Sequence, residues 1–227
     1  MLWSVAIMCY NEQATLQPMI ERTVAVMRKR AEPFEILIVD DGSKDGSGPL
    51  ADVLAASNPE VRVLHHPINF GIGSVLIDGY RQTHGACVVI LPADLQFAPE
   101  DLPAAMKELE HADVVNITRM RRHDRFMRKL ISFVDKALIR VLFGLRVGDL
   151  HWVKLYRREV LDKITIQSKT PIIDTELLVK AHRNKAKIIE VTLPHYPRTA
   201  GQSNGGRPML LIKTFIDLIK LRFTLKM

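Results

Sequence analysis

The sequence has few cysteines, few aromatic residues and no long uncharged apolar segment. Its 227 residues include two cysteines, Cys9 and Cys87, and neither lies in the Cys-x-x-Cys or Cys/His spacing of a zinc site. Both lie in apolar, strand-like runs, so we expect buried thiols in a reducing compartment. No run reaches the roughly 18 apolar residues of a membrane span, and no basic segment precedes the short apolar run at the start. We therefore expect a cytoplasmic chain without a signal peptide or a transmembrane helix.

Basic and acidic residues are divided unevenly along the chain, behind a net charge of +7. Residues 1–118 carry 8 Lys and Arg against 16 Asp and Glu, whereas residues 119–227 carry 24 against 9. The acidic half suits a metal ion or sugar hydroxyls. The basic half suits phosphates or an anionic membrane, unless it is simply a solvated face. Nucleic acid is not expected as a partner, because aromatic residues make up only 6% and form no stacking platform among basic residues.

Short Val- and Ile-rich runs alternate with longer amphipathic segments in the first half of the chain. The expected strands are Ser4–Cys9, Glu35–Val39, Arg62–His65, Cys87–Leu91 and Val114–Thr118. The expected helices between them are Gln13–Arg30, Gly48–Ser57, Ile72–Thr83 and Pro99–His111. Such alternation predicts an α/β fold with a mostly parallel sheet and helices on both faces. A Gly-x-Gly-x-x-Gly sequence does not follow the first strand, which argues against an NAD-dependent enzyme.

The second half is less regular. We expect helices at Arg125–Phe143, Thr175–Asn184 and Arg207–Phe223, and strands at Val153–Tyr156 and Lys187–Leu193. The last helix has a wide apolar face with one polar stripe, so either it packs on the sheet or it lies in a membrane interface.

Polar and acidic residues follow three of the expected strands. These segments are Tyr10-Asn11-Glu12, Asp40-Asp41-Gly42-Ser43 and Pro92-Ala93-Asp94-Leu95-Gln96. Ligands of open α/β sheets bind at the carboxyl ends of the strands, so these residues are expected to meet at one ligand-binding edge.

Seven short motifs occur in an order that identifies a family. They are Cys-Tyr-Asn-Glu (9–12), Ile-Val-Asp-Asp-Gly-Ser-Lys-Asp-Gly-Ser (38–47), Asn-Phe-Gly-Ile-Gly (69–73), Ala-Asp-Leu-Gln (93–96), Leu-Tyr-Arg-Arg-Glu-Val (155–160), Thr-Glu-Leu-Leu (175–178) and Arg-Thr-Ala-Gly-Gln-Ser (198–203). With them the chain resembles the inverting glycosyltransferases of the GT-A fold, and among these the polyprenyl-phosphate type that includes dolichyl-phosphate mannose synthase. The resemblance implies one GT-A domain over residues 1–227. Residues 1–118 would form its nucleotide-sugar and metal half, and residues 119–227 its acceptor half.

The resemblance implies a site for the donor nucleotide at the first two strand ends. Asp41 would contact the base, and Tyr10 and Glu12 would line the same pocket. The other expected donor contacts are Asn11, Asp40, Gly71, Gly73 and Ala93. Two simpler interpretations stay open: Asp41 and Ser43 could cap the next helix, and the two glycines could form a tight loop.

A divalent metal is expected at Asp94 and Gln96. Both side chains offer the hard oxygen ligands that suit Mg²⁺ or Mn²⁺, and alternation along an extended segment would place them on one side. Similar enzymes have Asp-x-Asp-x-Gln here, but Pro92 replaces the first aspartate. A relative that binds nucleotide without catalysis is therefore an alternative.

Arginines of the second half are the expected phosphate ligands. The resemblance implies that Arg119 and Arg198 hold phosphate groups and that, with the metal-binding Asp94, they are the catalytic residues. Arg122, Arg128 and Ser203 complete the expected acceptor site. Trp152 stands where relatives have a small residue and glycine, which predicts a bulkier acceptor floor. If the acceptor were a sugar hydroxyl, Asp149 and Asp174 would be the candidate bases.

The expected activity is transfer of a sugar, with inversion, from a nucleoside-diphosphate sugar to a polyprenyl phosphate. The alternative acceptor is a soluble saccharide or small molecule. A lipid acceptor implies peripheral contact with the cytoplasmic face of the membrane.

Overall fold

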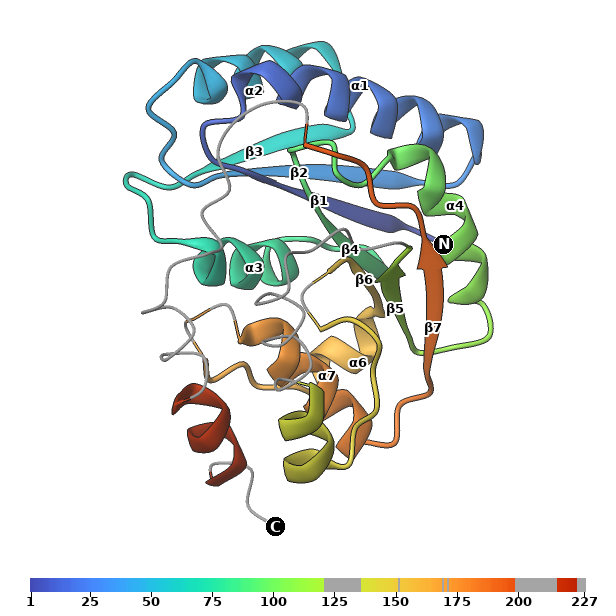
Figure 1. Ribbon diagram of the computed structural model, residues 1–227. Helices are drawn as coiled ribbons and strands as arrows, with labels where there is room; N and C mark the ends of the chain where they lie inside the picture. Colours follow the sequence, from blue (N-terminus) through green and yellow to red (C-terminus); the bar gives the residue numbers. More distant parts are fainter. Residues whose placement is uncertain (121–135, 151, 169, 171, 199–215, 224–227) are drawn as a thin grey trace.

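A seven-stranded mixed sheet forms the centre of the molecule (Figure 1). The computed structural model describes residues 1–120, 136–150, 152–168, 170, 172–198 and 216–223. The strands are β1 (Trp3–Cys9), β2 (Phe34–Asp40), β3 (Val61–His65), β4 (Cys87–Pro92), β5 (Val114–Arg119), β6 (Lys154–Arg157) and β7 (Ile188–Leu193). Their order is β3-β2-β1-β4-β6-β5-β7. Only β6 pairs antiparallel with its neighbours, so the carboxyl ends of the other six strands share one edge.

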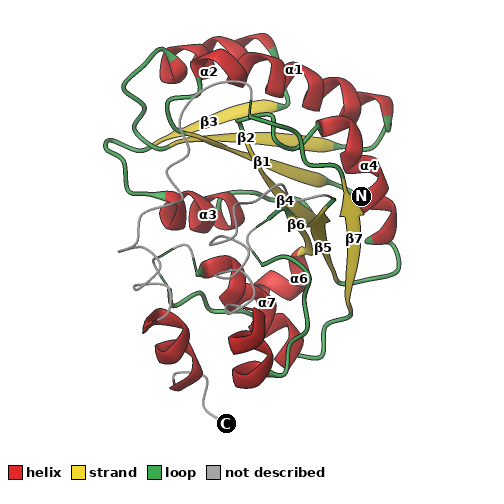
Figure 2. Ribbon diagram, viewed as in Figure 1, coloured by secondary structure: helices red, strands yellow, loops and turns green. Residues whose placement is uncertain are grey.

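Helices cover both faces of the sheet (Figure 2). They are α1 (Gln13–Lys29), α2 (Ser47–Ser57), α3 (Ile72–Arg81), the 3-10 turn η1 (Pro99–Asp101), α4 (Leu102–Glu108), α6 (Arg158–Asp162) and α7 (Ile173–Arg183). Side chains of α1, α2 and α4 pack in one apolar cluster with the sheet, and those of α3, α6 and α7 pack in a second. Residues 136–143 and 216–223 are also helical and add Ile139 and Leu218 to the second cluster.

The expected α/β fold and its order of elements are confirmed. The segment expected as one helix at Pro99–His111 is shorter, because it begins as a 3-10 turn and ends at Glu108. In the described part of the last expected helix, Leu218 and Leu221 are buried, as expected of a helix that packs on the rest of the fold, whereas Ile216, Ile219 and Phe223 are exposed.

Cys9 and Cys87 are buried free thiols, as expected. Burial, together with nearby Asp40, raises the pKa of Cys9 to about 12, so this thiol stays protonated. Among the residues that the structure describes, no helix is both long and apolar enough to cross a bilayer.

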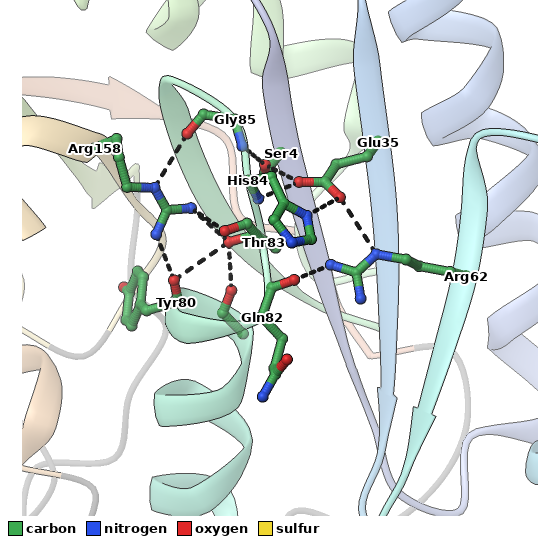
Figure 3. Close-up of polar contacts among 10 residues, drawn as sticks. Ser4, Glu35, Arg62, Tyr80, Gln82, Thr83, His84, Gly85 and Arg158 are labelled. Carbon is green, nitrogen blue, oxygen red and sulfur yellow. Dashed lines mark hydrogen bonds and ion pairs between the residues drawn. The ribbon is translucent and has the colours of Figure 1, made fainter. Parts of the chain in front are cut away.

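The turn between α3 and β4 is tied to the amino ends of the strands by two charged side chains (Figure 3). Arg158 donates hydrogen bonds to the carbonyl oxygens of Tyr80 (2.6 Å) and Thr83 (2.7 Å) at the end of α3. Glu35 accepts from Ser4 Oγ (2.6 Å) and forms an ion pair with Arg62 (3.3 Å). This cluster lies at the sheet edge opposite to the ligand-binding edge expected from the sequence.

Candidate active site

The carboxyl ends of β1, β2 and β4 lie next to one another, because these strands are parallel neighbours. Cys9 pairs with Asp40, and Met8 pairs with Pro92. The polar segments after the three strands therefore begin at the same level of the sheet, as expected from the sequence.

Two loops of the expected nucleotide site are joined by hydrogen bonds. The Asn11 N–H donates to Ser43 Oγ (3.0 Å), and the Lys44 N–H donates to Asn11 Oδ1 (2.8 Å). The Glu12 N–H donates to Ser47 Oγ (2.9 Å). Tyr10, which precedes Asn11 in the sequence, is half-buried. No polar contact of its side chain is seen among the described residues. These bonds join the two loops directly.

Asp40 and Asp41 are both buried and serve different loops. Asp40 accepts from the Ser43 N–H (3.1 Å). Asp41 accepts from the N–H groups of Phe70 (2.9 Å) and Gly71 (2.8 Å). The capping alternative for Asp41 and Ser43 is wrong, since neither side chain accepts a bond from the first turn of α2. Gly71 has a φ of 88° and precedes α3, while Gly73 and Ala93 are buried.

The Asp94-Leu95-Gln96 segment is a turn, so the expectation of an extended segment is wrong. Leu95 has a φ of 59°, and the Gln96 N–H donates to Asp94 Oδ1 (3.0 Å). The bond forms because a carboxylate two residues earlier can accept from the backbone of a turn. Gln96 Nε2 lies 3.4 Å from His195 Nε2. The turn thus directs Gln96 toward the segment after β7.

Arg198 connects the first strand end with the metal segment. Its guanidinium donates to Glu12 Oε1 and lies 3.8 Å from Asp94 Oδ2. Burial raises the pKa of Glu12 and of Asp94, and the charge of Arg198 partly offsets this in both. The positive charge of Arg198 favours the ionised form of both carboxylates, against the effect of burial.

Arg119 contacts an acidic and an aromatic side chain. It binds Asp149 through two hydrogen bonds (2.6 and 3.1 Å) and lies over the ring of Trp152, with its central carbon 5.0 Å from the ring centroid. Trp152 also packs edge-on against His195, with ring centroids 5.0 Å apart, and against Phe97. Asp149 is buried and pairs with Arg119, so it is unsuited to act as a base.

Asp174, the other candidate base, lies in α7 beside a buried lysine. Lys154 Nζ is 3.6 Å from Asp174 Oδ2 and donates to the carbonyl oxygens of Leu150 (2.8 Å) and Trp152 (2.9 Å). The lysine thereby fixes the backbone that carries Trp152. Asp174 has a structural partner, and its role as a base gains no support from this geometry.

Sequence reasoning missed His195 and His66 as members of this region. His195 follows the carboxyl end of β7, and this position was the available signal. His66 directly follows β3 and bonds to Asp41 (2.7 Å). Arg122, Arg128 and Ser203 lie outside the described residues.

The residues around Asp94 offer a donor set that fits a divalent cation. The carboxylate of Asp94, the amide oxygen of Gln96 and the imidazole of His195 come from neighbouring segments, and all three groups are known metal ligands. The described residues contain no cluster of three or more His, Cys, Asp or Glu suited to a metal. A cation here would therefore depend on additional oxygens from a bound diphosphate.

The fold and the site define a class: an α/β protein with a mostly parallel sheet, whose acidic strand ends are joined by an arginine. The sequence profile described as glycosyl transferase family 2 matches residues 4–165. The chain belongs to this family.

Curated relatives resemble nearly the whole chain. It is 34% identical over 226 residues to undecaprenyl-phosphate 4-deoxy-4-formamido-L-arabinose transferase of Pectobacterium atrosepticum, covering 98% of this chain and 65% of the relative. The enzyme of the same name from Photorhabdus laumondii is 32% identical over 220 residues, covering 95% and 66%. The chain spans about two thirds of the length of these relatives.

Solved structures confirm the GT-A fold. Glucosyl-3-phosphoglycerate synthase from Mycobacterium tuberculosis, in complex with Mn²⁺, UDP and glucosyl-3-phosphoglycerate, gives a TM-score of 0.71 at 19% identity, covering 97% of this chain and 80% of that one. Its complex with Mg²⁺ and UDP also gives 0.71 at 19% identity, covering 95% and 78%.

Proposed function

We propose that this chain transfers a sugar, with inversion, from a nucleoside-diphosphate sugar to a polyprenyl phosphate. The observation that carries the proposal is the position of Arg198 between Glu12 and Asp94, at the strand ends where nucleotides bind in such sheets. The names of the curated relatives support the lipid-phosphate acceptor.

In the proposed reaction, the acceptor phosphate itself is the nucleophile. It is ionised at neutral pH, so a phosphate oxygen attacks the anomeric carbon while the bond from that carbon to the nucleoside diphosphate breaks. No proton has to be removed, which agrees with the ion pairs of Asp149 and Asp174. Positioning and charge stabilisation supply most of the acceleration.

Arg119 and Arg198 would orient the phosphate groups. Guanidinium groups bind phosphate oxygens in pairs, and the contacts to Trp152 and Asp149 restrict Arg119 to one orientation. Asp94, Gln96 and His195 would hold Mg²⁺ or Mn²⁺, which would neutralise charge on the departing diphosphate. Solved relatives of the same fold contain these ions together with UDP.

The lipid acceptor implies peripheral binding of the chain at the cytoplasmic face of the membrane. Exposed Ile216, Ile219 and Phe223 in the last described helix support this contact.

Two measurements test the proposal. In a thermal-shift screen of UDP, GDP, CDP and dTDP, each with and without Mn²⁺, we expect one nucleotide to raise the melting temperature in a metal-dependent manner. With the corresponding nucleotide sugars, we expect transfer of label to undecaprenyl phosphate in detergent and loss of transfer in Asp94→Asn. Transfer to soluble saccharides alone would replace the proposed acceptor. Nucleotide binding without any transfer would indicate the non-catalytic relative.

A further inference from the structure

Two consecutive histidines each bridge two aspartates at the end of β3. Nδ1 and Nε2 of His65 lie 2.9 Å from Asp40 and 3.0 Å from Asp52 of α2. The same atoms of His66 lie 2.7 Å from Asp41 and 3.0 Å from Asp78 of α3. Neighbouring residues of an extended strand point to opposite faces of a sheet, and α2 and α3 cover opposite faces. Each aspartate of the 40–41 pair therefore has its own histidine and its own helix.

The His66 bridge is the buried one. Side chains of His66 and Asp41 are 6% and 3% exposed, whereas those of His65 and Asp52 are 42% and 65% exposed. An ionised carboxylate only accepts hydrogen bonds, so in a bond with ionised Asp41 the donor is Nδ1 of His66. Removal of this donor would leave a buried acceptor of Asp41 without its partner, which is costly.

Asp41 is the acceptor for three donors. Oδ1 accepts from His66 and from the Phe70 N–H, and Oδ2 accepts from the Gly71 N–H. A carboxylate offers about four acceptor positions, so about one position on Oδ2 is left for a ligand. The three donors therefore determine that a nucleotide reaches Asp41 through Oδ2.

The loop that supplies two of these donors also packs on Gly42. A Cβ atom at Gly42 would lie 2.5 Å from the carbonyl carbon of Ile68, so the two backbones are in direct contact. The His66 ring packs on the Phe70 ring, with centroids 5.3 Å apart. His66 thus contacts the Asp41 motif, the loop at residues 66–71 and helix α3.

We propose that His66 is a positioning residue for the donor nucleotide. The Nδ1 bond of His66 holds the Asp41 carboxylate and the Phe70–Gly71 backbone in one orientation. Asp78 of α3 anchors the ring. The inference rests on the proposed function, because it takes Asp41 as a contact of the nucleoside.

The test uses two substitutions of His66, each of which retains an amide near one of the two ring nitrogens. The amide of Asn reaches about as far as Nδ1, so His66→Asn retains a donor toward Asp41. The longer His66→Gln places its amide near the position of Nε2, toward Asp78. Titration calorimetry would measure Kd of the full chain, in Mn²⁺, for whichever of UDP, GDP, CDP and dTDP binds wild type most tightly. The exposed His111 supplies the control variant, His111→Gln.

We expect Kd to rise about tenfold in His66→Gln, no more than a few-fold in His66→Asn, which keeps a donor toward Asp41 but loses the Asp78 anchor, and less than about twofold in His111→Gln. Equal Kd values for wild type and His66→Gln would overturn the inference, as would equal losses in both His66 variants, which would indicate packing alone. If His66→Gln does not fold, as judged by circular dichroism, Asp78→Ala replaces it. That variant removes only the anchor of the ring, so Kd should rise a few-fold, and an unchanged Kd would overturn the inference. Wild type that binds none of the four nucleotides would overturn the proposed function, and the inference with it.

Discussion

Arg198 shows how one side chain can serve two strand ends. Its guanidinium contacts Glu12 after β1 and lies 3.8 Å from Asp94 after β4. Both carboxylates are substantially buried, so without a cation each would repel the other and any bound diphosphate.

We expect Arg198→Gln to lower turnover by about 100-fold, because a charged donor at developing negative charge is lost. Arg198→Lys should retain part of the rate, since it keeps the charge but cannot reach two partners. Steady-state kinetics with nucleotide sugar and lipid phosphate would measure both. Arg81→Ala, at an exposed arginine of α3, is the control. Full activity in Arg198→Gln would remove this residue from the site.

Trp152 stands where the family resemblance leads us to expect a small residue, and the structure shows the neighbours of its ring. The ring lies under Arg119 and against His195 and Phe97. A cation over an indole ring contributes about 0.5–2 kcal/mol, depending on burial.

Trp152→Ala should therefore raise KM for the acceptor phosphate by roughly 3- to 30-fold, because Arg119 loses the ring that restricts it. Kd of the nucleoside diphosphate, measured without metal, should change less, since the ring contacts seen for Trp152 among the described residues are those with Arg119, His195 and Phe97. Trp152→Phe retains an aromatic face, so its KM for the acceptor phosphate should lie between the values of wild type and Trp152→Ala. Acceptor titrations at saturating donor would measure the change, and a rise in donor Kd alone would contradict this assignment.

At the level of elements, the sequence predicted the strands within one or two residues. Val- and Ile-rich runs such as Cys87–Leu91 are buried on both faces and have no other stable place in the fold. The segment after β4 was predicted less well. Hydrophobic alternation carries no information about Leu95, whose positive φ depends on the bond between Asp94 and the Gln96 backbone.

The candidate site was predictable only in part, for a similar reason. Strand ends pointed to Glu12, Asp41 and Asp94, because the sheet brings them to one edge. His66 and His195 also follow strand ends, but their partners lie in segments that only tertiary folding brings near. Trp152 was noticed for its bulk, but its contact with Arg119 follows from the position of β6 between β4 and β5.

Two glycines with similar backbone angles allow a test of the contact between loops. Gly42 and Gly144 have φ values of 66° and 70°. A Cβ atom at Gly42 would lie 2.5 Å from the backbone of Ile68, whereas no atom of the described residues lies within 4 Å of one at Gly144. Gly144→Ala should cost about 1–2 kcal/mol from backbone strain alone. Gly42→Ala should cost about 1–3 kcal/mol more because of the overlap. Urea unfolding of both variants would measure the difference, and equal losses would mean that the loop moves away freely.

At the level of the whole molecule, acidic side chains at the two edges of the sheet have pKa values shifted in opposite directions. The carboxyl edge carries buried carboxylates with raised pKa values, whereas the amino edge carries Glu35 (Figure 3). Burial works against ionisation of Glu35, but hydrogen bonds from His84 and Ser4 and the charge of Arg62 outweigh it and lower its pKa to about 2.

This lowered pKa makes stability depend on pH with a definite sign. The unfolded carboxyl titrates near 4.5, so the stabilisation is complete above that pH and is lost as the pH falls toward 2. Glu35→Gln should reduce the free energy of unfolding at pH 7 by about 2 kcal/mol, less than the full pKa change implies because solvent partly screens the exposed Arg62 pair, and the difference from wild type should shrink as the pH falls toward 2. Thermal unfolding across this range would measure it. A difference that is constant with pH would show that the charge of Glu35 contributes nothing.

The contact between Glu12 and Arg198 spans 186 positions of the chain. During synthesis, β1 to β4 and both aspartates of the 40–41 pair leave the ribosome long before Arg198 does. Since Arg198 follows β7, the cation that joins Glu12 to Asp94 is among the last parts of the site to emerge. A nascent chain that has folded only its first half holds an acidic edge without its arginine, so the proposed use of a sugar nucleotide would have to await the end of β7.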